Sequence, residues 1–472
     1  MHTGGAAIPY LRPLLSVWLG LLVGCAVPVW ASTIATTATI TPAPAAQLIA
    51  DYSSGYRALG IAQLNLSYAQ NIQAILDEPD TASQRVFFKG IQKRLQTADA
   101  QGATDCEKLH LKILAFEVGT HLQKLDVVDK FVEQGGRAKV SPEGLASMPM
   151  GQDWYRYFLK RWLTLETTPE ALMAFGKQEL AQALLRYRAL QSKMGFEGKD
   201  AAFYAYLATE QFFYPEGQTP LADYEARQAT VYRNLHKLFL VTEVQPARVM
   251  QSTRGAAMPA DAYYDTDTRT FYFNRAKPRF ERRNVDWLLL HESTPGHHYH
   301  TSYARLRQAC PAPWPSVFYA AFAEGWSAYV EEFGEPLGLY RQDSDALGAV
   351  EWDLVRSVRV VLDVGINHEG WSPQQARQYW QQMLPMLPDL AEREIARVRN
   401  WPVQAITYKR GAALFRELRA QARARQGAAF DIRLFHDQAL KHGGMPLAVL
   451  PGWVLGGDLG LQSVGFGDPV VR

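Results

Sequence analysis

The chain has 472 residues, which suits one large domain or two coupled lobes, and its 47% hydrophobic and 20% charged residues are typical of a folded globular protein rather than a disordered one. The 49 Lys and Arg residues nearly balance the 47 Asp and Glu residues, so nothing points to the basic surface of a nucleic-acid-binding protein, and we expect no nucleic-acid partner. The three cysteines are too few for a disulfide scaffold and too far apart for a cysteine-rich zinc module.

The first residues have the pattern of a secretory signal. An apolar run from Leu14 to Gly24 follows Arg12, and it is too short for a stable transmembrane anchor. Leu22-Val23-Gly24-Cys25 resembles the bacterial lipobox, in which the cysteine is lipidated; alternatively, a conventional signal would be cleaved before Ser32. We favour the lipobox, which predicts an exported, periplasmic protein that associates with a membrane through lipidated Cys25, as an outer-membrane lipoprotein facing the periplasm.

The predicted organisation has three parts: a lipoprotein-type signal peptide (1–24), a flexible Ser-, Thr-, Ala- and Pro-containing tether (25–48) and one helical domain (49–472). No later segment approaches 18 uninterrupted apolar residues, so we expect no transmembrane helix in the mature protein. Cys106 and Cys310 could pair in an oxidising periplasm, although the sequence does not show that they meet. The sequence does not indicate an oligomeric state.

After the tether, apolar residues recur with helical spacing. This pattern predicts helices over residues 87–95, 109–132, 154–165, 179–194 and 221–240, and a helix start at Thr167-Thr168-Pro169-Glu170. Residues 248–273 differ, because tyrosines, phenylalanines and threonines surround Asp-Thr-Asp turns, which favours a short β hairpin. Helical patterns resume to about residue 442. We therefore predict a mainly α fold with a small β hairpin beside the site.

The most informative segment is His291-Glu292-Ser293-Thr294-Pro295-Gly296-His297-His298-Tyr299-His300, which holds four of the eleven histidines. An adjacent His-Glu pair after the apolar segment 285–290 is typical of a zinc hydrolase, in which the histidine binds the metal and the glutamate activates water. The second histidine is usually four residues later. Position 295 is a proline, so the usual spacing fails here.

Two other histidines are candidates for the second ligand. His298 lies on the same helical face as His291 but about 10.5 Å along an unbroken helix, which zinc–nitrogen bonds of about 2.1 Å cannot easily bridge. His297 is off that face in a regular helix, but Pro295 and Gly296 favour a kink or bulge that could bring it to His291. We favour His297. The alternative is a basic loop with ordinary, hydrogen-bonded histidines.

The third ligand is expected on another helix, and Glu324 in the segment 318–334 is the candidate. It lies among alanines, where an unpaired carboxylate is costly to bury and a metal ion would satisfy it. Glu331 lies on the same helical face and could orient a ligand from behind. The alternative is a salt bridge between Glu324 and an arginine.

Two of these motifs together, His291-Glu292-x-x-Pro295-Gly296-His297-His298 and Glu324-Gly325-Trp326-x-x-Tyr329-x-Glu331, resemble the bacterial domain-of-unknown-function 885 family. The proteins of that family look like distant relatives of helical zinc metallopeptidases such as thimet oligopeptidase and the Taq-type carboxypeptidases. The resemblance extends from about residue 50 to the C-terminus. It implies a helical metallopeptidase-like domain with the hairpin beside its cleft, a Zn²⁺ cofactor, and His297 as a ligand.

The expected reaction is hydrolysis of short peptides at zinc held by His291, His297 and Glu324, with Glu292 as general base. Tyr408 is the first candidate donor to the oxyanion, although an ordinary core tyrosine is the alternative. His368 is a further catalytic candidate by resemblance, but the family has histidine one position earlier, where this chain has Asn367.

Substrate contacts are expected from Arg359, Tyr264 and Arg410. Arg359 could hold a substrate carboxylate through its guanidinium fork or simply pair with Asp363 along its helix, and the first role is favoured by resemblance. Tyr264 borders the hairpin, which could add a strand to an extended peptide. Two other functions remain open: a lipid-anchored peptide-binding protein without turnover, and a zinc hydrolase of a non-peptide amide or ester.

Overall fold

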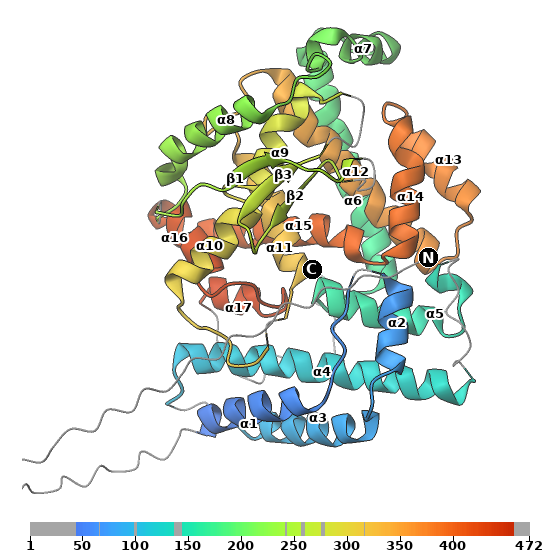
Figure 1. Ribbon diagram of the computed structural model, residues 1–472, viewed down its shortest axis with the longest axis vertical. Coiled ribbons are helices and arrows are strands. Elements are labelled where there is room, and N and C mark those ends of the chain that lie inside the picture. Colours follow the sequence, from blue (N-terminus) through green and yellow to red (C-terminus); the bar gives the residue numbers. More distant parts are fainter. Residues whose placement is uncertain are drawn as a thin grey trace, which may run out of the picture. The chain divides into compact units, whose positions relative to one another are not determined.

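A computed structural model describes residues 44–456, apart from residues 66, 99–101, 136–143, 241–242, 256–259, 275–278 and 316 (Figure 1). The predicted signal peptide, Cys25, residues 25–43 of the tether and the last residues of the chain lie outside this part. None of the described helices has the length and apolarity needed to cross a membrane.

The described chain begins with four helices, of which α1, α3 and α4 lie side by side (Figure 1). Their bounds are α1 (Pro44–Ala58), α2 (Tyr68–Leu76), α3 (Thr81–Gln96) and α4 (Asp105–Glu133). Helix α1 starts inside the segment assigned to the tether. The reason is that Ala45, Leu48, Ile49 and Tyr52 follow helical spacing and are all buried, so packing orders this end of the predicted tether.

A disulfide joins Cys106 at the start of α4 to Cys310. The sequence left this pairing open, because the two cysteines are 204 residues apart. The bond ties the N-terminal helices to the segment that follows the histidine motif.

The remaining helices form the body that carries the site. They are α5 (Gly151–Phe158), α6 (Pro169–Lys193), α7 (Asp200–Leu207), α8 (Leu221–Asn234), α9 (Val285–Glu292), α10 (His297–Arg307), α11 (Ala320–Val330), α12 (Asp343–Asn367), α13 (Pro373–Met383), α14 (Ala391–Asn400), α15 (Gln404–Gln426), α16 (Ile432–Leu440) and α17 (Leu450–Val454). Four of the predicted helical segments lie largely within α3, α4, α6 and α8, and the fifth, 154–165, covers the end of α5 and the π-helical turn Leu159–Leu163 that follows it. Thr168 caps α6 as its sequence predicts, because its side chain accepts a hydrogen bond from the backbone N–H of Ala171. The fold is therefore mainly helical, as predicted.

The predicted hairpin is present as β2 (Ala262–Asp265) and β3 (Thr270–Phe273), which pair antiparallel. A third strand, β1 (Arg248–Gln251), adds parallel to β3, so the element is a three-stranded mixed sheet in the order β1-β3-β2 (Figure 1). The sequence did not predict this strand, because parallel pairing depends on contacts that local alternation does not reveal. Phe271 and Phe273 of β3 pack against Tyr224 of α8. In the order β1-β3-β2, strand β2 lies at an edge of the sheet.

Helices α11 and α15 cross at backbone contact, and this crossing fixes the position of the site. A Cβ atom added to Gly325 would lie 2.5 Å from the Cα of Gly411, and one added to Gly411 would lie 2.2 Å from the carbonyl oxygen of Ala321. Only glycine allows this approach. Glu324 and Tyr408 lie beside this crossing on the two helices, so the contact sets the spacing between them.

Candidate metal centre

Helix α9 carries His291 and Glu292 at its C-terminal end. All of its residues are buried, because the segment Val285–Leu290 packs into the core between α8, α11 and α12. His291 is only 3% exposed and Glu292 8% exposed. The apolar helix therefore delivers two polar side chains to an interior site, where each needs a partner.

A turn over residues 293–296 separates helix α9 from helix α10. A Cβ atom on Gly296 would lie 1.8 Å from the carbonyl oxygen of His291, so the turn closes onto the end of α9 in a way that only glycine permits. The indole N–H of Trp326 donates a hydrogen bond of 2.8 Å to the carbonyl of Pro295 and holds the turn against α11. The kink or bulge expected within one helix is instead the end of one helix and the start of the next, because the close turn at Gly296 redirects the backbone.

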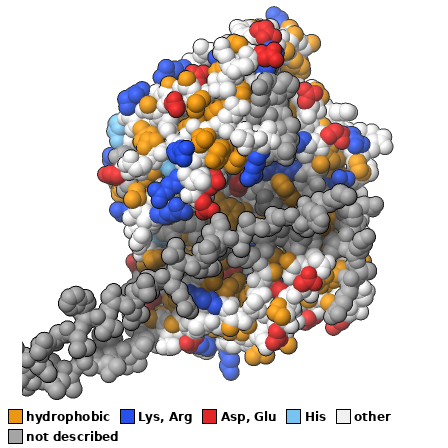
Figure 2. Space-filling view, viewed as in Figure 1, with side chains coloured by type: hydrophobic (Ala, Val, Ile, Leu, Met, Phe, Trp, Pro, Cys, Tyr) orange, Lys and Arg blue, Asp and Glu red, His pale blue; other side chains and the backbone are white. Residues whose placement is uncertain are grey.

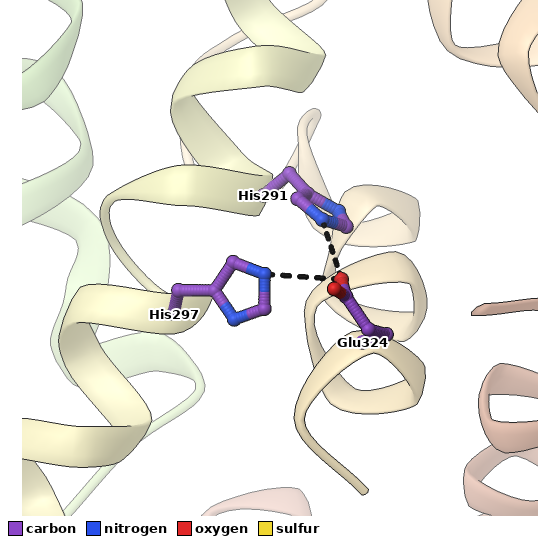
Figure 3. Close-up of side chains that lie close together, drawn as sticks. All are labelled: His291, His297 and Glu324. Carbon is purple, nitrogen blue, oxygen red and sulfur yellow. Dashed lines mark hydrogen bonds and ion pairs between the residues drawn. The ribbon is translucent and has the colours of Figure 1, made fainter. Parts of the chain in front are cut away.

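This break brings His297, the first residue of α10, to His291. Figure 3 shows the two imidazoles and the carboxylate of Glu324, from α11, pointing toward one another. Nε2 of His291 lies 3.4 Å from Oε2 of Glu324, and Nε2 of His297 lies 3.1 Å from the same oxygen. One ligand atom from each residue lies within 4.8 Å of the other two, so the three residues form a possible metal-binding group.

The donor set and spacing suit zinc. A tetrahedral zinc ion with bonds of about 2.0–2.2 Å has ligand atoms about 3.3–3.6 Å apart, close to the nitrogen–oxygen separations found here. Two histidines and one carboxylate are a common ligand set of catalytic zinc, which leaves a fourth position open. The expected alternative for Glu324, a salt bridge to an arginine, is absent from the described residues.

Glu331 supports His291 from behind the centre. Its Oε1 lies 2.7 Å from Nδ1 of His291, and its Oε2 accepts a hydrogen bond of 2.7 Å from Arg356. A carboxylate at Nδ1 holds a proton on that nitrogen, so Nε2, which faces Glu324 and His297, is the atom left to bind a metal ion. The ring orientation is therefore fixed for metal binding.

The charges of the centre depend on one another. Burial alone would lower the pKa of His291, but its hydrogen bonds to Glu324 and Glu331 raise that pKa to about 9. Burial opposes ionisation of Glu324, yet the two histidines lower its pKa well below the usual range. Burial also raises the pKa of Glu292. Glu324 and Glu331 thus favour positive charge at the imidazoles, and a bound divalent cation would supply that charge.

The centre opens into a cavity of about 690 Å³. Residues of β2, including Tyr264, line one side, and aromatic side chains of Trp287, Trp352 and Phe318 line others. A volume of this size is in the usual range for a bound small ligand. Glu292 lines the cavity together with the three residues of the metal-binding group.

Tyr408 and four arginines line the same cavity. The Tyr408 ring stacks at 5.9 Å on the ring of His291, and its hydroxyl accepts hydrogen bonds from Arg397 (3.0 Å) and Gln404 (3.2 Å). Arg359 is buried and donates to Glu394 rather than pairing with Asp363. Asp363 instead accepts hydrogen bonds from the Tyr155 hydroxyl and the Val403 backbone N–H.

Three predicted residues lie elsewhere. His298 is turned away from the centre, because its two ring nitrogens lie 3.0 Å from the Tyr264 hydroxyl and 2.6 Å from the Gln245 carbonyl. His368, at the end of α12, stacks on Tyr155 and is not among the residues that line the cavity. Arg410 is likewise not a lining residue and lies over the ring of Phe175.

The sequence analysis missed Arg356, Arg397 and His300, all of which line the cavity. Arg393 and Arg397 are one helical turn apart and lie on the same face of α14. The charged face of an amphipathic helix usually faces solvent, so the pattern alone gave no reason to select these arginines. His300 is one turn after His297, and its Nε2 has no hydrogen-bond partner within the described chain.

Figure 2 shows basic and acidic side chains interspersed on the face drawn, as expected from the near-balanced composition.

Comparisons with known proteins agree on a family and a fold. The family described as "Bacterial protein of unknown function (DUF885)" matches residues 30–454. A "putative lipoprotein" from Colwellia psychrerythraea has a similar structure, with a TM-score of 0.62 and 23% identity over 82% of this chain and 72% of that one. A "putative lipoprotein of unknown function" from Shewanella oneidensis gives a TM-score of 0.55 and 15% identity over 87% of each chain. No curated protein matches the chain.

Proposed function

The chain belongs to the bacterial DUF885 family of proteins of unknown function, and we propose that it is a zinc-dependent hydrolase that cleaves the amide bonds of short peptides. One observation carries the proposal: His291, His297 and Glu324 converge beside Glu292 at the wall of a cavity of about 690 Å³. A structural metal site would be closed, whereas these residues supply three ligands and face a space that a substrate can enter.

His291, His297 and Glu324 are the residues that would hold the ion. When bound in such a site, zinc polarises a substrate carbonyl and lowers the pKa of a water molecule to about 7. The task of Glu331 is to hold the proton of His291 on Nδ1, through the 2.7 Å contact. Arg356 donates a hydrogen bond of 2.7 Å to the other carboxylate oxygen of Glu331 and so holds that carboxylate against His291.

Glu292 is the proposed general base. It follows a ligand directly in sequence and lines the cavity, so its carboxylate faces the space where water and substrate would meet. Burial raises its pKa, which makes the carboxylate a better proton acceptor than an exposed glutamate. The same group would then deliver the proton to the leaving amine.

Tyr408 is the proposed donor to the oxyanion. Its hydroxyl oxygen already accepts hydrogen bonds from Arg397 and Gln404, so its own proton is free to be donated into the cavity. Burial and the charge of Glu324 raise the pKa of Tyr408, and the Arg397 guanidinium offsets only part of this, so the hydroxyl keeps the proton that it would donate. Stacking on the His291 ring keeps the phenol at the edge of the centre.

We also propose that the protein is exported, with residues 1–24 as signal peptide and Cys25 as the site of lipidation. The disulfide between Cys106 and Cys310 supports an oxidising compartment. Each of the two similar structures is described as a "putative lipoprotein", which agrees with the motif at residues 22–25 of this chain. Mass spectrometry of the mature N-terminus tests this assignment, since cleavage before Ser32 would contradict it.

A peptide-library digest read by mass spectrometry tests the hydrolase. We expect cleavage by the purified protein, loss of cleavage with a chelator, and recovery when zinc is restored. Glu292→Gln should keep the metal and lose at least 100-fold in rate, since a general base contributes about 10²–10⁴-fold. Glu335→Gln, at an exposed position, is the matched control.

Two outcomes would point elsewhere. Peptide binding without cleavage by zinc-loaded protein would favour the binding-protein alternative, and turnover of esters or other amides alone would favour a non-peptide substrate. Full activity of Glu292→Gln would reject the assigned base.

A further inference from the structure

The wall of the cavity beside Tyr408 carries an excess of positive charge. Among the described residues, Arg359, Arg393 and Arg397 line it together with two carboxylates outside the metal centre, Asp261 and Glu394. Arg359 and Arg393 both bind Glu394, and Arg393 also lies 3.7 Å from Asp261. Arg356 is neutralised separately by Glu331. Within the part of the chain that the structure describes, one guanidinium therefore remains without a direct ion pair.

That guanidinium belongs to Arg397. Among the described residues no carboxylate lies within ion-pair distance of it, and its hydrogen-bond partners are two neutral oxygens, Oε1 of Gln404 and the hydroxyl of Tyr408. These bonds use Nε and Nη2, so Nη1 keeps its donors. Gln404 and Tyr408 hold the planar group in a fixed orientation, which is the preorganisation that a bound anion requires.

Arg359 adds a second unused donor. Its side chain is 2% exposed, and only Nε is engaged by Glu394, at 2.7 Å. Its Nη2 has no hydrogen-bond partner within the described chain. A buried guanidinium nitrogen without a partner is costly, and an oxygen of an incoming anion would remove that cost.

The subsite lies one aromatic ring away from the metal centre. The Tyr408 ring centre is 5.9 Å from that of His291 and 5.6 Å from the Arg397 guanidinium carbon. The His291 ring and the Arg397 guanidinium are therefore at most about 11.5 Å apart, and an extended peptide, which advances about 3.3–3.6 Å per residue, spans this with up to about three residues. A carbonyl at the centre and a carboxylate at Arg397 can therefore belong to one short peptide.

We propose that Arg397, with Arg359, binds the free C-terminal carboxylate of the substrate, so that the protein removes a short segment, of up to about three residues, from the C-terminus of peptides. This inference rests on the proposed hydrolase function for its reaction, but the carboxylate subsite stands on the arginines alone. A planar guanidinium matches a carboxylate in geometry and charge. An acidic side chain offers the same chemistry, and the experiment distinguishes the two sources.

Calorimetric titration of the Glu292→Gln protein with neutral tetrapeptides tests the subsite without turnover. Each peptide is compared as free acid, as C-terminal amide, and as an amide that ends in glutamate. We expect the free acids to bind about 10- to 100-fold more tightly than either amide, the range for hydrogen bonds to a charged group. The titrations are run with and without zinc, so that carboxylate binding to the metal is separated from binding to the arginine.

Arg397→Met in the same background should abolish the preference for the free acid, and Arg397→Lys should restore part of it. Arg377→Met, at an exposed position outside the cavity, should leave the preference unchanged. Thermal unfolding of each variant checks that it folds. The proposal would be overturned if acids and amides bind equally, if the preference survives Arg397→Met, or if no free acid binds. If the glutamate amide binds as tightly as the free acid, the subsite recognises acidic side chains instead.

Product analysis with the wild-type protein separates this inference from the function on which it rests. Cleavage of acids and amides alike would support the hydrolase and overturn the C-terminal preference. A preference for free acids that depends on Arg397, without cleavage of any peptide, would support the subsite and reject the peptidase.

Discussion

The contact between Glu331 and His291 gives the most specific prediction, which is the effect of Glu331→Gln on zinc affinity. The carboxylate makes two buried contacts of 2.7 Å, to Nδ1 of His291 and to Arg356. An amide of the same shape can satisfy only one of them. If its oxygen accepts from Arg356, its N–H₂ group faces Nδ1 and moves the imidazole proton to Nε2, the atom required for the metal.

The expected loss is 10- to 100-fold in zinc affinity, the range for changes behind a metal ligand, or about 1.4–2.8 kcal/mol. The same free energy should be missing from the stabilisation that saturating zinc gives the protein against unfolding. The free energy of unfolding of each variant is compared with and without zinc, because the destabilisation caused by the lost ion pair with Arg356 is present in both measurements and cancels. Competition with a chromophoric chelator measures the affinity directly.

Glu332→Gln is the matched control. It makes the same change one residue later, where the side chain is exposed and binds Arg416 and Arg419 at the surface. Its zinc affinity should equal that of the wild type, because exposed ion pairs contribute little. A Glu331→Gln protein with the affinity of this control would refute the role assigned to Glu331.

Three further predictions concern the ligand choice, the helix crossing and pH. His297→Ala should lose most of the bound zinc, whereas His298→Ala should retain it, as measured by elemental analysis; equal zinc in both would reject His297 as a ligand. Gly411→Ala places a methyl group against a carbonyl oxygen of α11 and should lower the free energy of unfolding by about 1–3 kcal/mol or more, as measured by urea titration. Gly90→Ala, where the methyl group meets no other atom, should be neutral or slightly stabilising. The opposite order of stabilities would contradict the close contact of α11 and α15. Burial raises the pKa of Asp363 to about 7, so its contribution to stability is full below about pH 4 and is lost as the pH rises through 7. Between pH 5 and pH 8 the wild type should therefore lose about 2.5 kcal/mol relative to Asp363→Asn, and parallel pH profiles would contradict this assignment.

Local sequence patterns predicted the helices and the histidine motif well, because both depend on short-range features. Buried positions in α4 and α6 recur at helical spacing. The segment before His291, which is largely apolar in the sequence, is also buried in the fold. The hairpin was predicted from its turn residues. Strand β1 was not, because its partner is 22 positions away and parallel.

The metal-binding group could be proposed from the sequence because glycine and proline between the histidines signal a break in the helix. The form of the break could not, since it depends on how closely Gly296 approaches the end of α9. Arg359 was proposed from the sequence as a carboxylate ligand, but Arg397 was missed for a different reason. Arg397 is distinguished by what it lacks, a carboxylate partner among the described residues, and such a lack appears only when α12, α14 and α15 are packed together.

The most direct test of the central claim, that His291, His297 and Glu324 hold one zinc ion, is a crystal structure of the zinc-loaded protein with diffraction data on both sides of the zinc absorption edge. The account predicts one anomalous peak per chain, about 2.0–2.2 Å from Nε2 of both histidines and from a carboxylate oxygen of Glu324. A zinc-loaded crystal without a peak there, or with its peak on other residues, would contradict it.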